Sequence, residues 1–200
     1  MTKVANIFTI LCLTGFMFFT SACGETKTAS ESETTSTTTD ETSTKPTEDK
    51  SKRPSPPAVA TAAVGATNVT IDYSSPAAKG RTIWGDLVPY DQVWRTGANE
   101  ATTFTVDKNV MINGQALAAG KYSLFTIPTQ GEWTVIFNSV ENLWGAYDYD
   151  ATKDVLRVTA SPRMLDESVD RLKFDIGADG KVTLTWDKLA LDFTVAEAGN

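Results

Sequence analysis

The sequence contains no histidine, and its only cysteines are Cys12 and Cys23. A Ser-His-Asp or Cys-His catalytic arrangement is therefore excluded, as is a zinc site of the usual histidine and cysteine type. If Cys12 is removed with an export signal, the mature chain cannot form an internal disulfide. We therefore expect packing alone to hold the folded part together, with no cofactor and no metal ion.

Clustered positive charge is also missing. The chain has 18 Lys and Arg against 25 Asp and Glu, a net charge of −7, and a pI near 4.6. From Pro57 onward 12 basic residues stand against 18 acidic ones, so this part alone carries about −6. Because phosphate binding needs clustered Lys and Arg, we do not expect nucleic acid as a partner.

No apolar run is long enough to span a bilayer. The run from Ile7 to Phe19 covers thirteen residues, whereas a spanning helix needs about 20. Lys3 precedes it and the small residues of Thr20-Ser21-Ala22-Cys23 follow it. This order predicts a signal peptide over residues 1–22 and lipidation of Cys23, since the tetrapeptide resembles the lipobox of bacterial lipoproteins. Thr20 stands where Leu is usual, and an ordinary signal cut after Ala22 stays open.

The next segment has almost nothing apolar. Gly24 to Arg53 contains 15 Ser or Thr among 30 residues and no aromatic, Val, Leu or Ile. Such a stretch cannot bury enough apolar surface to offset its ordering entropy. We predict that residues 23–57 form the lipidated cysteine and a disordered linker. Either this linker spaces the domain from the membrane, or it is a solvated tail with no specific role.

From Ala58 the apolar residues recur with a period of two. Val69, Ile71 and Tyr73 alternate with polar residues, and later runs repeat the pattern. We predict one domain, residues 58–197, that is an all-β antiparallel sandwich, jelly-roll-like or Ig-like, of eight to ten strands. A closed β-barrel is the alternative, because the sequence does not show which strands pair. The strands are expected at 59–64, 69–73, 102–106, 110–112, 121–127, 133–137, 155–160, 171–176, 182–186 and 189–195, with turns at Asn113-Gly114 and Asp187-Lys188 among others.

One stretch, residues 79–100, lacks strand character apart from a possible short helical turn near 90–94. A loop this long inside a compact domain is usually functional or well packed. It contains Trp84-Gly85 and the run Trp94-Arg95-Thr96-Gly97-Ala98-Asn99-Glu100. Together with the segments at 119–128, 132–138 and 144–147, this run resembles a family of bacterial envelope proteins catalogued as domain of unknown function 2911. The resemblance covers nearly all of residues 58–195 and implies an exported, mainly β domain without an assigned activity.

Strong hydrogen-bonding groups lie beside aromatic residues in this loop. A ligand cleft is one interpretation, in which aromatic faces stack on a sugar or peptide while charged and amide groups orient it. The other is a buried polar network that fastens the loop to the sandwich. The candidate ligand-binding residues are Arg81, Trp84, Trp94, Arg95, Asn99 and Glu100.

The function predicted from these features is a lipid-anchored module, exported and held on a bacterial membrane, with the outer membrane favoured. We expect it to be a non-catalytic binding or structural module whose partner is a glycan, a peptide or an envelope protein. The alternative is a carboxylate-dependent glycan hydrolase that pairs Glu100 with Asp86 or Asp148. The acidic run at residues 148–154 lacks the glycine and the distal acid of a calcium loop, which favours a solvated turn.

Overall fold

The computed structural model describes residues 48–199. The predicted signal peptide, the predicted lipidation site Cys23 and most of the predicted linker lie outside the described residues. Within residues 48–199, no helix has the length and apolar character needed to cross a membrane.

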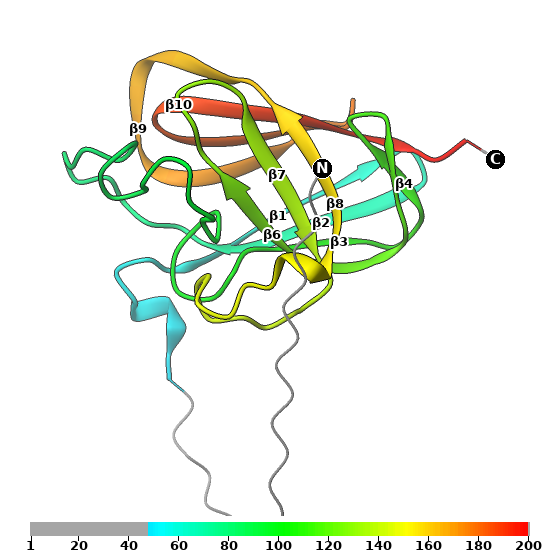
Figure 1. Ribbon diagram of the computed structural model, residues 1–200, viewed down its shortest axis with the longest axis horizontal. Coiled ribbons are helices and arrows are strands. Elements are labelled where there is room, and N and C mark those ends of the chain that lie inside the picture. Colours follow the sequence, from blue (N-terminus) through cyan, green and yellow to red (C-terminus); the bar gives the residue numbers. More distant parts are fainter. Residues whose placement is uncertain (1–47, 200) are drawn as a thin grey trace, which may run out of the picture. The chain divides into compact units, whose positions relative to one another are not determined.

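In residues 48–199, ten strands form two antiparallel sheets that pack face to face (Figure 1). The prediction of an all-β sandwich is confirmed, and the alternative of a closed barrel is wrong because the strands divide into two separate sheets. The six-stranded sheet has the order β1 (Pro57–Val64), β2 (Thr67–Ser74), β3 (Thr103–Val106), β6 (Gly120–Ile127), β7 (Trp133–Asn138) and β8 (Asp154–Ala160). The four-stranded sheet has the order β5 (Gln115–Leu117), β4 (Val110–Ile112), β10 (Lys181–Glu197) and β9 (Pro162–Ile176).

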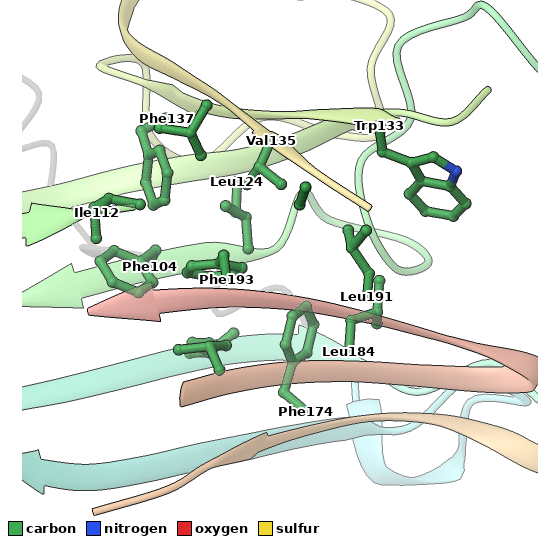
Figure 2. Packing of buried hydrophobic residues seen from close by; sticks show 14 of the residues in the cluster. Phe104, Ile112, Leu124, Trp133, Val135, Phe137, Phe174, Leu184, Leu191 and Phe193 are labelled. Atoms are coloured by element: carbon green, nitrogen blue, oxygen red, sulfur yellow. The ribbon is translucent and has the colours of Figure 1, made fainter. Parts of the chain in front are cut away.

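The main core lies between the two sheets, as the period-two pattern requires. The rings of Phe104 and Phe137 meet edge to face at 5.0 Å, and Phe193 of β10 lies 6.2 Å from Phe104 across the core. Figure 2 shows apolar side chains of the two layers pointing toward one another, among them Phe104, Leu124, Val135, Phe137, Phe174, Leu184, Leu191 and Phe193. Burial of this set is the principal stabilising contribution to the fold.

A second, smaller core lies on the outer face of the six-stranded sheet. Phe125 of β6 and Ile136 of β7 face away from the main core, yet both are fully buried. Residues of two loops cover them, including Val93, Leu143 and Tyr149. Because this cluster needs both loops, it holds the β2–β3 loop and the β7–β8 loop beside each other.

Strand boundaries near the C-terminus differ from the prediction. The expected turn at Asp187-Lys188 is wrong, because β10 runs through both residues as one strand. Asp187 has φ 50° and sits where the register with β9 shifts, so its left-handed backbone forms a bulge rather than a turn. β9 also begins earlier than expected, at Pro162, and the short β5 was not expected.

The predicted turn at Asn113-Gly114 is confirmed between β4 and β5. Ile112 pairs with Gln115, which leaves two residues in the turn, with φ 45° and 79°. Two positive φ values are the requirement of a type I′ hairpin, and Asn-Gly meets it with little strain.

Residues 48–56 contact the domain, although the linker was predicted to reach residue 57. They contain a short 3₁₀ turn, η1 (Lys50–Lys52), and the Ser75 amide donates to the Pro56 carbonyl at 2.8 Å. Arg53 also pairs with Glu100, 47 residues away. A polar composition predicts disorder, but it does not show a distant ion-pair partner. A second 3₁₀ turn, η2 (Ala151–Lys153), precedes β8.

Candidate functional site

The β2–β3 loop, residues 75–102, is fastened to the sandwich by backbone hydrogen bonds. Trp94 and Thr126 of β6 exchange both amide hydrogen bonds, at 2.8 and 2.9 Å. The Ala101 amide donates to the Leu143 carbonyl at 2.9 Å, which joins this loop to the β7–β8 loop. The predicted helical turn near 90–94 is wrong, because these residues form turns and an isolated bridge.

Four tryptophans join the loop to both sheets. Trp84 lies 4.9 Å from Trp133 of β7 and 5.8 Å from Trp186 of β10, measured between ring centroids. Trp94 stacks on Trp186 at 5.9 Å, with 17° between the ring planes. Trp94 is buried and its Nε1 donates to the Gly97 carbonyl at 3.2 Å. Trp84 is only partly buried, and its Nε1 is buried without a hydrogen-bond partner among residues 48–199.

Thr96 holds a strained backbone next to Arg95. Its φ is 55°, a left-handed conformation that costs a β-branched residue about 1–3 kcal/mol. The surroundings maintain it, since its Oγ1 donates to the Trp94 carbonyl at 3.3 Å and its carbonyl accepts from Thr102 Oγ1 at 2.8 Å. The strained residue therefore sets the direction of the chain on either side of it.

Arg95 is partly buried and has no protein partner in the part of the chain that the structure describes. Its Nε is fully buried without a hydrogen bond, and its guanidinium makes no hydrogen bond or ion pair with residues 48–199. Burial lowers the pKa of Arg95, while Tyr147 acts in the opposite direction. An arginine remains protonated even so, which leaves a positive charge and unused donors at the surface of the loop.

Two hollows adjoin at Arg95. One of about 280 Å³ lies toward Arg81 and Trp186, and one of about 310 Å³ lies toward Tyr147. Both are lined by Leu87, Trp94 and Arg95. Tyr147 is 83% exposed and Leu87 is 44% exposed, so apolar surface lies open to solvent beside the unpaired cation. A carboxylate that carries an apolar or sugar face would meet both features here.

Arg81 and Asn99, which the sequence also singled out, are partly used by the protein itself. Arg81 Nε and Nη2 donate to the carbonyls of Ala78 and Ala77, at 3.0 and 2.6 Å. Asn99 Nδ2 donates to the Ser55 carbonyl at 3.0 Å. Both residues nevertheless line the 280 Å³ hollow with Arg95.

Glu100 lies in a different environment from Arg95. Lys50 Nζ is 2.8 Å from its carboxylate, and Arg53 Nη1 bonds both of its oxygens, at 3.0 and 2.9 Å. Burial raises the pKa of Glu100, but hydrogen bonds from Lys50 and Arg53 outweigh it and bring the pKa to about 2. Arg53 also lies 5.7 Å from the Trp144 ring. Glu100 thus anchors residues 48–56 and does not line either hollow at Arg95.

The other carboxylates considered from the sequence do not share a hollow with Glu100. Glu100 lines a hollow of about 500 Å³ with Lys50 and Arg53, whereas Asp86 and Asp148 are exposed and line neither this hollow nor those at Arg95. Within residues 148–154, Asp150 caps η2 and Asp154 accepts hydrogen bonds from Asn138 and Tyr149. Across the described range, no group of three Asp, Glu, Cys or His residues is arranged to hold a metal ion.

Leu87 and Tyr147 were missed among the candidates. Tyr147 belongs to the Trp144-Gly145-Ala146-Tyr147 segment, which the resemblance had already singled out. Tyr147 and Arg95 are distant in sequence, so the sequence did not show that they line one hollow, an arrangement that depends on the small outer core holding the two loops together.

The model of a protein family described as protein of unknown function (DUF2911) matches residues 55–195. No curated protein and no solved structure gives a significant match.

Proposed function

The chain belongs to the DUF2911 family, whose function is unknown, and we propose that its domain is a non-catalytic binding module that holds a carboxylate of an envelope ligand at Arg95. Tyr147 and Leu87 would contact the apolar or sugar face of that ligand. We propose also that Cys23 is lipidated and keeps the module on a bacterial membrane.

The observation that carries the binding proposal is the guanidinium of Arg95, which lines both hollows with a buried Nε and has no hydrogen-bond partner among residues 48–199. Buried polar groups are nearly always hydrogen-bonded, and leaving one unpaired costs about 1–3 kcal/mol. A carboxylate would bond the terminal nitrogens of this guanidinium, which have no partner among residues 48–199, through two parallel hydrogen bonds. Strain at the neighbouring Thr96 supports the same site, because strained backbone clusters at ligand-binding positions.

The alternative of a carboxylate-dependent hydrolase has no comparable support. A glycosidase needs one carboxyl group that stays protonated near neutral pH and a second one across the cleft. Hydrogen bonds from Lys50 and Arg53 hold the pKa of Glu100 at about 2, so Glu100 is ionised and occupied by two cations. These features favour a structural role for Glu100 and binding without catalysis.

The binding proposal is tested by NMR of arginine side chains. The Nε resonance of Arg95 would be followed while the full chain, in detergent, is titrated with galacturonate or with neutral galactose. We expect a saturable shift of the Arg95 resonance with galacturonate only, and the same shift in Arg163→Met. In Arg95→Met, whose spectrum lacks this resonance, calorimetric titration should show that galacturonate binding is lost. Arg163 is a suitable control because it pairs with Asp192 and lines neither hollow. Equal shifts with galactose, or none with either sugar, would contradict the proposal.

The anchor is tested separately. Mass spectrometry of the N-terminal peptide should show acyl chains on Cys23, and Cys23→Ala should move the protein from the membrane to the soluble fraction. An unmodified Cys23 in membrane-bound protein would contradict lipidation without affecting the binding proposal.

A further inference from the structure

A third hollow extends the site beyond Arg95. It measures about 310 Å³ and is lined by Pro54, Ser55, Ala77, Lys79 and Arg81. Ser55 and Arg81 also line the 280 Å³ hollow, which in turn shares Arg95 with the hollow at Tyr147. The three hollows therefore follow one another, from Lys79 through Arg81 and Arg95 to Tyr147. We call this row the loop groove.

The loop groove is uniformly positive on an acidic domain. Its charged lining residues are Lys79, Arg81 and Arg95, and none of the described residues that line it is an Asp or Glu. Asp170 is close to one end, but its carboxylate accepts the backbone amide of Lys79, at 2.8 Å. None of the three cationic side chains forms an ion pair with a carboxylate within residues 48–199. Such a row of cations would attract a ligand with several negative charges along its length.

The walls of the loop groove suit a sugar chain better than a peptide. Peptides that bind in extended form commonly add to a free strand edge, whereas Trp186 is the one lining residue that belongs to a described strand. The groove offers instead an exposed aromatic ring at Tyr147 and polar side chains at Ser55, Gln92 and Asn99. A ring can stack on a sugar face while amide and hydroxyl groups bond sugar hydroxyls.

We propose that the loop groove binds a linear acidic glycan of uronate units, with one carboxylate at Arg95 and further carboxylates toward Arg81 and Lys79. This rests on the proposed function, because Arg95 supplies the first contact. Once the first uronate unit is bound, each further unit of the same glycan binds as an effectively intramolecular step. Affinity should therefore rise with chain length. It should also fall with salt, since the Debye length is about 8 Å at physiological ionic strength.

The test is calorimetric titration of the full chain, in detergent, with galacturonate oligomers of one to four units. We expect the trimer or tetramer to bind about tenfold or more tightly than the monomer. Lys79→Gln should weaken the tetramer about threefold to tenfold and leave the monomer unchanged. The matched control is Lys188→Gln, an exposed lysine outside the groove, and it should change neither affinity.

The outcomes separate this inference from the proposed function. Equal affinity for monomer and tetramer, with no effect of Lys79→Gln, would overturn the extended groove while Arg95 remains a carboxylate site. No binding of the monomer and no shift of the Arg95 resonance would remove the proposed function itself. Tighter binding of tetraglutamate than of tetragalacturonate would overturn the choice of a glycan over an acidic peptide.

Discussion

At Arg95, stability and binding make opposite demands on one side chain. Its partly buried guanidinium has no acceptor among the described residues, which is unfavourable for folding. Binding sites that keep an unpaired charged group in the unliganded state generally use that group to bind the ligand. Replacing the group with an apolar one therefore tends to stabilise the unliganded protein.

We therefore expect Arg95→Met to raise the free energy of unfolding by about 1 kcal/mol, or the melting temperature by about 3 °C, while abolishing galacturonate binding. Arg81→Met is the contrasting variant: because Arg81 donates to two carbonyls, its loss should lower stability by about 1 kcal/mol. Urea melts measure both. A loss of 2–4 kcal/mol in Arg95→Met would mean that the guanidinium has a buried partner.

Glu100 makes stability depend on acid pH. Its pKa in the folded protein is about 2, below the ordinary 4.5, so its carboxylate stabilises the fold above pH 4.5 and this contribution is lost as pH falls toward 2. At 35% exposure its two ion pairs are screened, and we expect Glu100→Gln to cost only about 0.5–1 kcal/mol at pH 7. Denaturant melts should show that the stability difference between the wild-type protein and Glu100→Gln is smaller at pH 2.5 than at pH 7.

The control for Glu100 is Glu141→Gln, because Glu141 is an exposed carboxylate that forms no ion pair with residues 48–199. It should show little difference from the wild-type protein at either pH. A Glu100→Gln effect that persists unchanged at pH 2.5 would contradict the role given to the ion pairs.

At the scale of the element, the β4–β5 hairpin ties the two sheets together through one turn residue. Asn113 Nδ2 donates to the Thr159 carbonyl of β8 at 2.9 Å, and its Oδ1 accepts from the Thr194 amide of β10 at 2.8 Å. The same residue holds φ 45° in the turn. Backbone conformation and side-chain bonding therefore coincide at one position.

The two contributions separate by substitution. Asn113→Gly keeps the positive φ and loses only the side-chain bonds, so it should destabilise by about 1–2 kcal/mol. Asn113→Ala loses both and should destabilise by about 1 kcal/mol more. Denaturant melts would measure the difference, and equal losses for the two variants would show that the left-handed backbone imposes no strain here.

At the scale of the whole molecule, the β2–β3 loop behaves as part of the sandwich. Figure 1 shows this loop outside the strands, yet Trp94 contacts both sheets through the tryptophan cluster and pairs with Thr126 of β6. A segment held in this way should open only when the sandwich opens.

Hydrogen exchange tests this directly. The amides of Trp94 and Thr126 should exchange with opening free energies within about 1 kcal/mol of each other. Leu87 is the internal comparison, because its amide makes only a long hydrogen bond, 3.4 Å to the Thr82 carbonyl, and its side chain is exposed. Its amide should exchange much faster. Fast exchange at Trp94 with slow exchange at Thr126 would show that the loop opens independently.

The strands were predictable because their information is local. The alternation of Val69, Ile71 and Tyr73 specifies a strand with one buried face, and Asn113-Gly114 specifies a tight turn. The Asp187-Lys188 turn was wrong for a related reason: a left-handed residue fits a turn and a bulge equally, and only pairing with β9 distinguishes them.

The candidate site was predictable in part. Arg95 and Trp94 stood out because charge and aromatic rings are adjacent in the chain, and Arg95 does line the hollows of the site. Glu100 stood out for the same reason, but its partners Lys50 and Arg53 turn it toward the N-terminal segment. Tyr147 and Lys79 were missed because their approach to the site depends on loop packing.

The sequence by itself determined an all-β domain without histidine or a disulfide and a polar N-terminal segment. These follow from composition and from periods of a few residues. Only the tertiary structure decided that the strands form two sheets and not a barrel, that Arg95 has no partner among residues 48–199, and that three cations line one groove. Strand pairing, and whether a charged side chain finds a partner, depend on residues distant in the chain. Such residues meet only when the core has formed.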